Sequence, residues 1–76
     1  HISPKEKASS IVALAVAYRV VMSQRLADVM LMAMAAINHP SAMKGLEVLS
    51  TYFREVGIEP SEDVLRDAKT TLLLCE

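Results

Sequence analysis

The distribution of apolar and polar residues divides the chain into a long apolar first half and two shorter amphipathic segments. Residues 29–37 (VMLMAMAAI) contain no polar side chain, and neither glycine nor proline falls between residues 5 and 37. This absence of helix-breaking residues predicts one long N-terminal helix over residues 4–37. Ser23 is the one position where the pattern allows a break, near residues 22–23, because serine can cap the start of a second helix.

Both ends of this predicted helix carry recognisable signals. At the start, Ser3, Pro4 and Glu6 form the pattern of a capping box with proline at its favoured first position. At the end, Asn38 suits the left-handed closing position, and Pro40 disfavours a helical conformation of the residue before it. We therefore expect the first helical region to end at Asn38.

Two shorter antiparallel helices are predicted after this point, at about 41–56 and 61–75. Each has apolar residues at spacings of three and four, which define one buried stripe. Gly57 follows the first as a C-terminal cap with Ile58 folded back in a Schellman motif, and Ser61 is the expected N-cap of the second. The prediction is an all-α fold in a single helical interaction domain over residues 1–76, and the sequence is compatible with a fragment of a larger protein.

A helical wheel of the long helix places apolar residues on two opposite faces. The face expected to pack on the two later helices carries Ile11, Leu14, Tyr18, Met22, Val29 and Met32. The opposite, outer face carries Val12, Val16, Val20, Met30, Leu31 and Met34. Two short helices cannot surround so long a helix, so this outer face would remain exposed, and large exposed apolar patches mark interaction sites.

The outer face therefore predicts a protein–protein interaction module, in the simplest case a homodimer in which the first helices pair. One alternative is a small helical chaperone or adaptor that binds an amphipathic helix of another protein. A membrane-surface element is another alternative, although only Lys5 and Lys7 supply the flanking basic charge that it needs. If the helix instead breaks near Ser23, four short helices could close a bundle that needs no partner.

Three charged residues lie within the apolar first half: Arg19, Arg25 and Asp28. Because Arg25 and Asp28 are three residues apart, they can pair on one helix. A polar group within an apolar interface often fixes its register, so we include these residues in the predicted interface. A purely surface ion pair explains them equally well. The charges also make a membrane-spanning helix improbable, because each is costly at the bilayer centre.

Composition and charge exclude several classes of function. The net charge is −1 and no basic patch is visible, so a nucleic-acid partner is not expected. His39 and Cys75 have no companions at metal-ligand or catalytic spacing, and we interpret them as a turn residue and a small apolar residue. No metal, cofactor or enzymatic activity is predicted. A single cysteine is typical of a reducing compartment, so we expect a soluble, cytoplasmic protein.

Overall fold

The computed structural model describes residues 2–75, which form four α-helices joined by short connections. The elements are α1 (Pro4–Ala17), a 3₁₀ turn η1 (Arg19–Val21), α2 (Gln24–Ala36), α3 (Ala42–Glu55) and α4 (Glu62–Leu73). No strand occurs in this part of the chain. The prediction of an all-α fold is therefore confirmed.

The prediction of one continuous helix over residues 4–37 is wrong. The chain leaves α1 at Tyr18, and it is extended at Met22 (φ −64°, ψ 133°) and at Ser23 (φ −134°, ψ 167°). The Ser23 hydroxyl accepts a hydrogen bond from the Leu26 amide at 3.2 Å, so it caps a new helix. The interruption of the α-helix covers residues 18–23 and includes residues 22–23, where the sequence allowed a break as the alternative.

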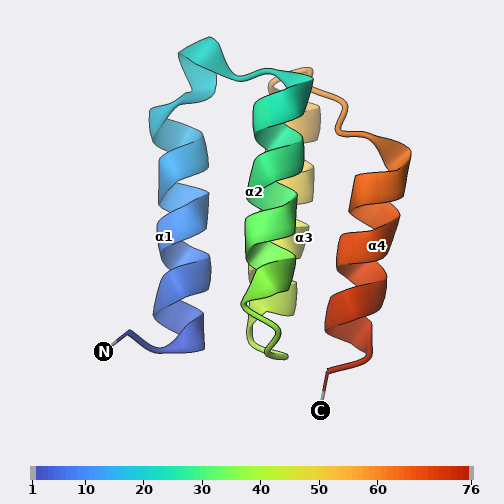
Figure 1. Ribbon diagram of the computed structural model, residues 1–76. Helices are drawn as coiled ribbons and strands as arrows, with labels where there is room; N and C mark the ends of the chain where they lie inside the picture. The colour runs from blue at the N-terminus through green and yellow to red at the C-terminus, as the bar shows by residue number, and fades with distance from the viewer. Residues whose placement is uncertain (1, 76) are drawn as a thin grey trace.

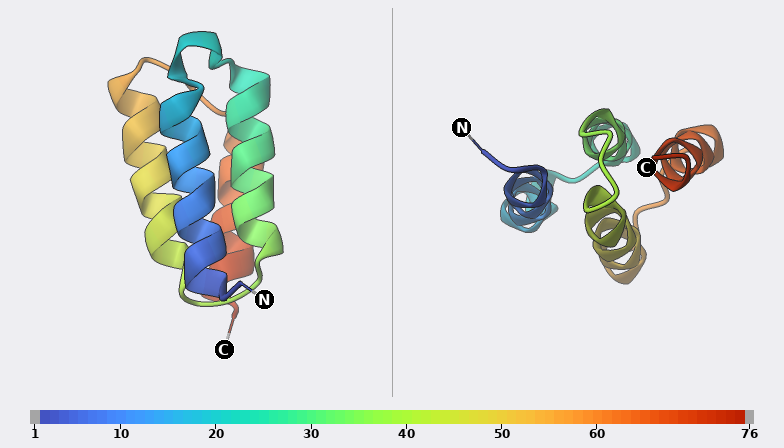
Figure 2. Two further views of the ribbon diagram at one scale, coloured as in Figure 1. Left: turned by 90° about the vertical axis from the view of Figure 1, so that its left-hand side faces the viewer. Right: turned by 90° about the horizontal axis from the view of Figure 1, so that it is seen from below.

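The four helices run alternately up and down along one direction (Figure 1). Helices α2 and α3 lie next to each other in the middle, while α1 packs on one side of this pair and α4 on the other (Figure 2). In the described part of the chain, α1 and α4 do not contact each other. The Cα atoms extend over 33 × 27 × 16 Å, so the bundle is flat and its helices keep broad outer faces.

The core lies where these helices meet the central pair. Its largest fully buried side chains are Phe53, Leu46 and Leu49 of α3 and Leu31 and Met34 of α2. Helix α1 contributes small residues instead, since its buried positions are Ala8 and Ala15. Small side chains at these positions allow α1 to approach the central pair closely.

The helix ends follow the sequence signals. The Glu6 amide donates to Ser3 Oγ at 3.2 Å and the Ser3 amide donates to Glu6 Oε1 at 3.4 Å, which completes the predicted capping box. Asn38 has φ 50° and therefore closes α2 in the left-handed conformation. Gly57 has φ 79°, and the Ile58 amide donates to the Phe53 carbonyl at 2.8 Å, as expected for a Schellman motif.

The connection between α3 and α4 is held against the start of α2. The Asp28 carboxylate accepts from the Ser61 amide at 2.8 Å and from the Ser61 hydroxyl at 2.6 Å. Gln24 Nε2 donates to the Glu59 carbonyl at 2.8 Å. Ser61 is the N-cap of α4 as predicted, but its hydroxyl binds Asp28 instead of its own helix. These bonds fix where α4 begins relative to α2.

Candidate functional site

An apolar hollow lies between α1 and α2, which run side by side (Figures 1 and 2). We call it the α1–α2 groove. Its lining residues are Ile11, Leu14 and Tyr18 from α1 and Leu26, Val29, Met30 and Ala33 from α2. The groove is open to solvent, has a volume of about 430 Å³, and no polar atom contributes to its lining. Such a surface costs free energy while it faces water.

Three walls of the groove are half exposed. Leu14 is 50 %, Tyr18 53 % and Val29 49 % accessible. Fully burying one such side chain contributes roughly 1.5–3 kcal/mol of free energy. A partner that covers the groove can therefore gain about half of that value at each of the three residues. Exposed apolar residues scattered singly are ordinary, but these three surround one hollow, and a continuous apolar patch is typical of a binding site.

The groove continues toward the N-terminal end of α1, where charge appears. Here Ile2, Ile11, Ala36 and Ile37 line an adjoining hollow together with Lys7 and Ser10. At the opposite end, Arg25 stands one turn before Val29 on the exposed side of α2. The apolar strip is therefore flanked by a cation at each end.

The predicted outer face of the first helix does not exist as one surface. Met30, Leu31 and Met34 are 7 %, 0 % and 0 % exposed and belong to the core. Conversely, Leu14, Tyr18 and Val29 were expected to face the core and instead line the groove. In α1 the large residues did not mark the core face, because this helix packs through Ala8 and Ala15. In α2 the expected face is reversed, because the chain turns back before residue 24 and the 100° rotation per residue does not carry over from α1.

The other three residues of the predicted face have different surroundings. Val12 is partly buried against the core beside α3, Val16 is half exposed, and Val20 in η1 is 89 % exposed. Val16 and Val20 remain on the surface as expected, but neither lines the α1–α2 groove. The structure thus brings Met30 alone of the six residues to the groove, where it forms part of the floor.

The predicted interface charges also separate. Arg19 and Arg25 are exposed, and neither forms an ion pair with any residue in the range 2–75. The proposed Arg25–Asp28 pair is absent from this range, since the partly buried Asp28 carboxylate binds Ser61. Asp28 therefore has a structural role between α2 and α4, which the sequence spacing did not indicate.

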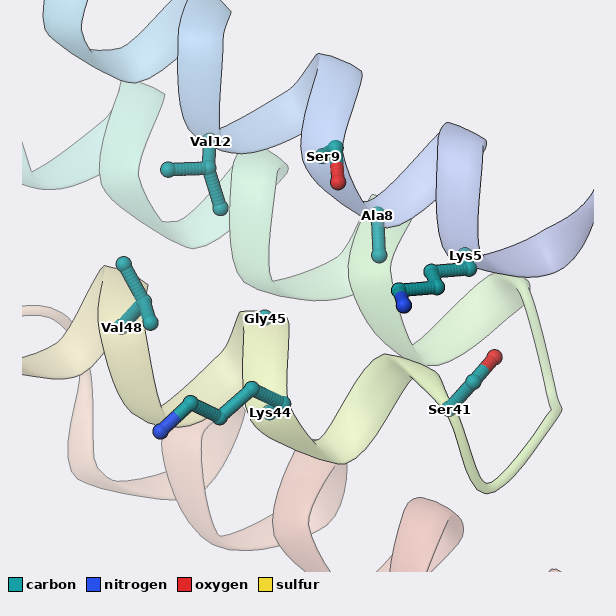
Figure 3. Close-up of a pocket in the computed structure, with 8 residues that line it drawn as sticks. All are labelled: Lys5, Ala8, Ser9, Val12, Ser41, Lys44, Gly45 and Val48. Carbon is teal, nitrogen blue, oxygen red and sulfur yellow. The ribbon is translucent and has the colours of Figure 1, made fainter.

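A second hollow, of about 250 Å³, lies between α1 and α3. Ala8 and Gly45 lie at its centre, with Val12 and Val48 toward one end and Lys5, Ser9, Ser41 and Lys44 around it (Figure 3). Lys5 extends from α1 toward α3, whereas Lys44 extends along α3 away from Ser41 (Figure 3). Because the two ammonium groups do not converge, this hollow lacks the concentrated charge that a small anion requires.

The remaining candidate residues have local partners. His39 Nδ1 accepts from the Ser41 amide at 3.1 Å and lies 2.8 Å from Ser41 Oγ, which matches the predicted turn role. Cys75 Sγ lies 3.1 Å from Asn38 Oδ1, so it joins the end of α4 to the end of α2. Residues 2–75 contain no group of three or more potential metal ligands. None of the described helices has both the length and the hydrophobicity needed to cross a membrane.

Comparison with known proteins adds no relative, since no protein-family model, curated protein or solved structure matches this chain.

Proposed function

We propose that this domain is a protein–protein interaction module whose α1–α2 groove binds one amphipathic helix of another protein. The observation that carries the proposal is the apolar lining of the groove, with Leu14, Tyr18 and Val29 each about half exposed. An amphipathic helix laid in such a groove buries the apolar surface of both partners, which is a common mode of peptide recognition.

The shape of the site favours a helix over an extended strand. Helices α1 and α2 are antiparallel neighbours of 14 and 13 residues, so the groove between them is about 20 Å long. A third helix can place its side-chain ridge between the two, as helices do in bundles. The described part of the chain consists of helices and connections, and it presents no sheet edge for strand addition.

The homodimer expected from the sequence is the less supported occupant. Its predicted interface required Met30, Leu31 and Met34 to face outward, and these side chains are in the core. A symmetric dimer through the α1–α2 groove would place one hollow against the same hollow of the other copy. A helix from another protein supplies the convex ridge that a hollow needs.

The test uses an unlabelled helical peptide and the ¹⁵N-labelled domain. The peptide has about four helical turns, the length of α1, with leucine and alanine in one stripe and glutamine elsewhere. We expect the amide resonances of residues that line the groove to shift during titration, while those of α4 stay unchanged. Half-exposed walls support a modest affinity, in the range of micromolar to millimolar dissociation constants.

Two matched variants make the test specific. Leu14→Asp places a charge in the groove and should weaken peptide binding at least tenfold. Val20→Asp adds the same charge at a residue that is 89 % exposed outside the groove, and it should leave binding unchanged. Both variants should keep the helical circular dichroism of the parent. Absence of any shift with the parent domain, or equal losses in the two variants, would overturn the proposal.

A further inference from the structure

The charges around the α1–α2 groove specify the partner further, and this step rests on the proposed function. We infer that the helix bound in the groove carries acidic residues beside its apolar stripe. The apolar lining gives the affinity, while the flanking charges of the domain select which helices bind and speed their association.

Cations stand at both ends of the groove. Lys7 lines the hollow that adjoins the groove near the N-terminal end of α1, together with Ile2 and Ile37. Arg25 lies at the other end, on the same exposed side of α2 as Val29, four residues later. Neither cation forms an ion pair with another residue in the range 2–75. Both are therefore available to an incoming carboxylate.

The carboxylates of this half of the molecule are already engaged. Residues 2–38 contain two acidic residues, Glu6 and Asp28. Glu6 accepts from the Ser3 amide and hydroxyl in the capping box, at 3.4 Å and 3.0 Å. Asp28 accepts from Ser61. Residues 2–38 also contain four basic residues, Lys5, Lys7, Arg19 and Arg25, so their net charge is +2 and its complement is an anionic partner.

The same charges argue against a second copy of this chain. In a symmetric dimer through the groove, cations would meet cations in either orientation, which disfavours the pair. The acidic side chains of α4 could approach the groove of another copy. However, apolar residues of α4 such as Val64 and Leu72 already face the core of their own bundle. Its exposed large apolar residues, Leu73 and Leu74, lie together at its C-terminal end, so they form no stripe along the helix to place in the groove.

An anionic membrane surface shares the required charge but fits the shape less well. Membrane-bound domains insert protruding apolar side chains into the lipid. Here the apolar surface is recessed between α1 and α2, and the exposed sides of Tyr18 and Val29 are walls of a hollow. A helix fills that hollow, whereas a lipid surface would leave it empty.

The experiment compares three peptides that share one leucine and alanine stripe and differ in the flanking residue, which is glutamate, glutamine or lysine. We expect the glutamate peptide to bind about tenfold more tightly than the lysine peptide at low salt. This ratio should fall toward one at about 0.5 M salt, because screening weakens exposed charge pairs. Affinities are measured by the ¹⁵N titration described above.

Charge reversal assigns the selection to the two cations. The variant Lys7→Glu/Arg25→Glu should prefer the lysine peptide. The control Arg54→Glu/Lys69→Glu makes the same change in net charge at exposed residues of α3 and α4, and it should keep the preference for glutamate. An effect of net charge alone would appear equally in both variants and would overturn the inference.

The outcomes separate this inference from the proposed function. If all three peptides bind the groove equally, the acidic partner is wrong and the helix-binding function stands. If none binds, the proposed function itself fails. Two further results would overturn the inference by naming another occupant: a dimer that persists on dilution in light scattering, or binding to vesicles of phosphatidylcholine and phosphatidylserine that Leu14→Asp abolishes.

Discussion

At the scale of single residues, Gly57 shows how one backbone angle restricts the choice of side chain. Its φ of 79° lies in the left-handed region, and nothing stands within 4 Å of the position that a Cβ would take. Any cost of substitution there is therefore conformational and not steric. We expect Gly57→Val to lower the free energy of unfolding by more than about 1 kcal/mol, because β-branched residues resist this conformation.

Urea denaturation followed by circular dichroism measures this change. Gly57→Asn is the matched control, since asparagine tolerates left-handed angles, and Asn38 adopts φ 50° at the end of α2. It should cost less than valine. Equal stability of the valine and asparagine variants would contradict the assignment of Gly57 as the cap of α3.

Substitution of Gly45 is restricted for a steric reason, because the surrounding side chains leave little room for a Cβ. A Cβ there would lie 2.9 Å from both Sδ and Cε of Met34 and 3.2 Å from the Ala8 Cβ. Alanine raises helix propensity by about 1 kcal/mol, but Met34 is fully buried and has little room to move. We expect the steric cost to dominate, so that Gly45→Ala destabilises the domain by about 1–2 kcal/mol.

A double-mutant cycle isolates this contact. In the Met34→Ala background, which lacks the sulfur and its methyl group, Gly45→Ala should become neutral or stabilising. The free energies of unfolding of the four proteins give the coupling directly. If Gly45→Ala costs the same in both backgrounds, its effect does not come from contact with Met34.

At the scale of elements, the break between α1 and α2 depends on Ser23. Its hydroxyl accepts from the Leu26 amide, and a lost N-cap bond of this type costs about 1 kcal/mol. We expect Ser23→Ala to lower the free energy of unfolding by about that amount. Ser23→Asp keeps a hydrogen-bond acceptor, so it should retain most of the stability of the parent. Chemical denaturation compares the two. Equal stability of Ser23→Ala and the parent would mean that the cap does not define the start of α2.

The same break explains which parts of the fold could be read from the sequence. The capping box at Ser3, the turn at Asn38 and the Schellman motif at Gly57 are local signals, and each predicted its helix end correctly. The Ser23 cap was visible as well, but nothing nearby forced the chain to reverse there. Whether an apolar helix continues or folds back depends on contacts with distant helices, which a single-chain pattern does not contain.

The candidate site was missed partly for this reason. A continuous helix places Val29 toward the core and Leu31 toward solvent, and the reversal exchanges these two faces. Leu14 was misplaced because α1 packs through the small residues Ala8 and Ala15, which the large apolar residues do not mark. Within α2 alone, Ala27, Met30, Leu31 and Met34 follow the spacing of a buried stripe. Analysed separately from α1, that segment would have indicated its core face. The pairing of Asp28 with Ser61 joins residues 33 positions apart and had no local signal.

At the scale of the whole molecule, a chain of 76 residues has little stability to spare. Domains of this size bury only about 60 % of their unfolded surface, and the groove keeps Leu14, Tyr18 and Val29 each about half exposed to water. Binding to the folded state should therefore raise stability measurably. This coupling links the marginal fold to the proposed interaction.

Thermal unfolding with and without the glutamate-flanked peptide tests the coupling. A ligand at ten times its dissociation constant adds about 1.4 kcal/mol, and each kcal/mol raises the melting temperature of so small a domain by roughly 4–8 °C. We expect the melting temperature of the parent and of Val20→Asp to rise by the product of these two values, and that of Leu14→Asp to stay unchanged. A peptide that binds yet leaves the melting temperature unchanged must bind the unfolded chain equally well, which a site formed jointly by α1 and α2 does not allow.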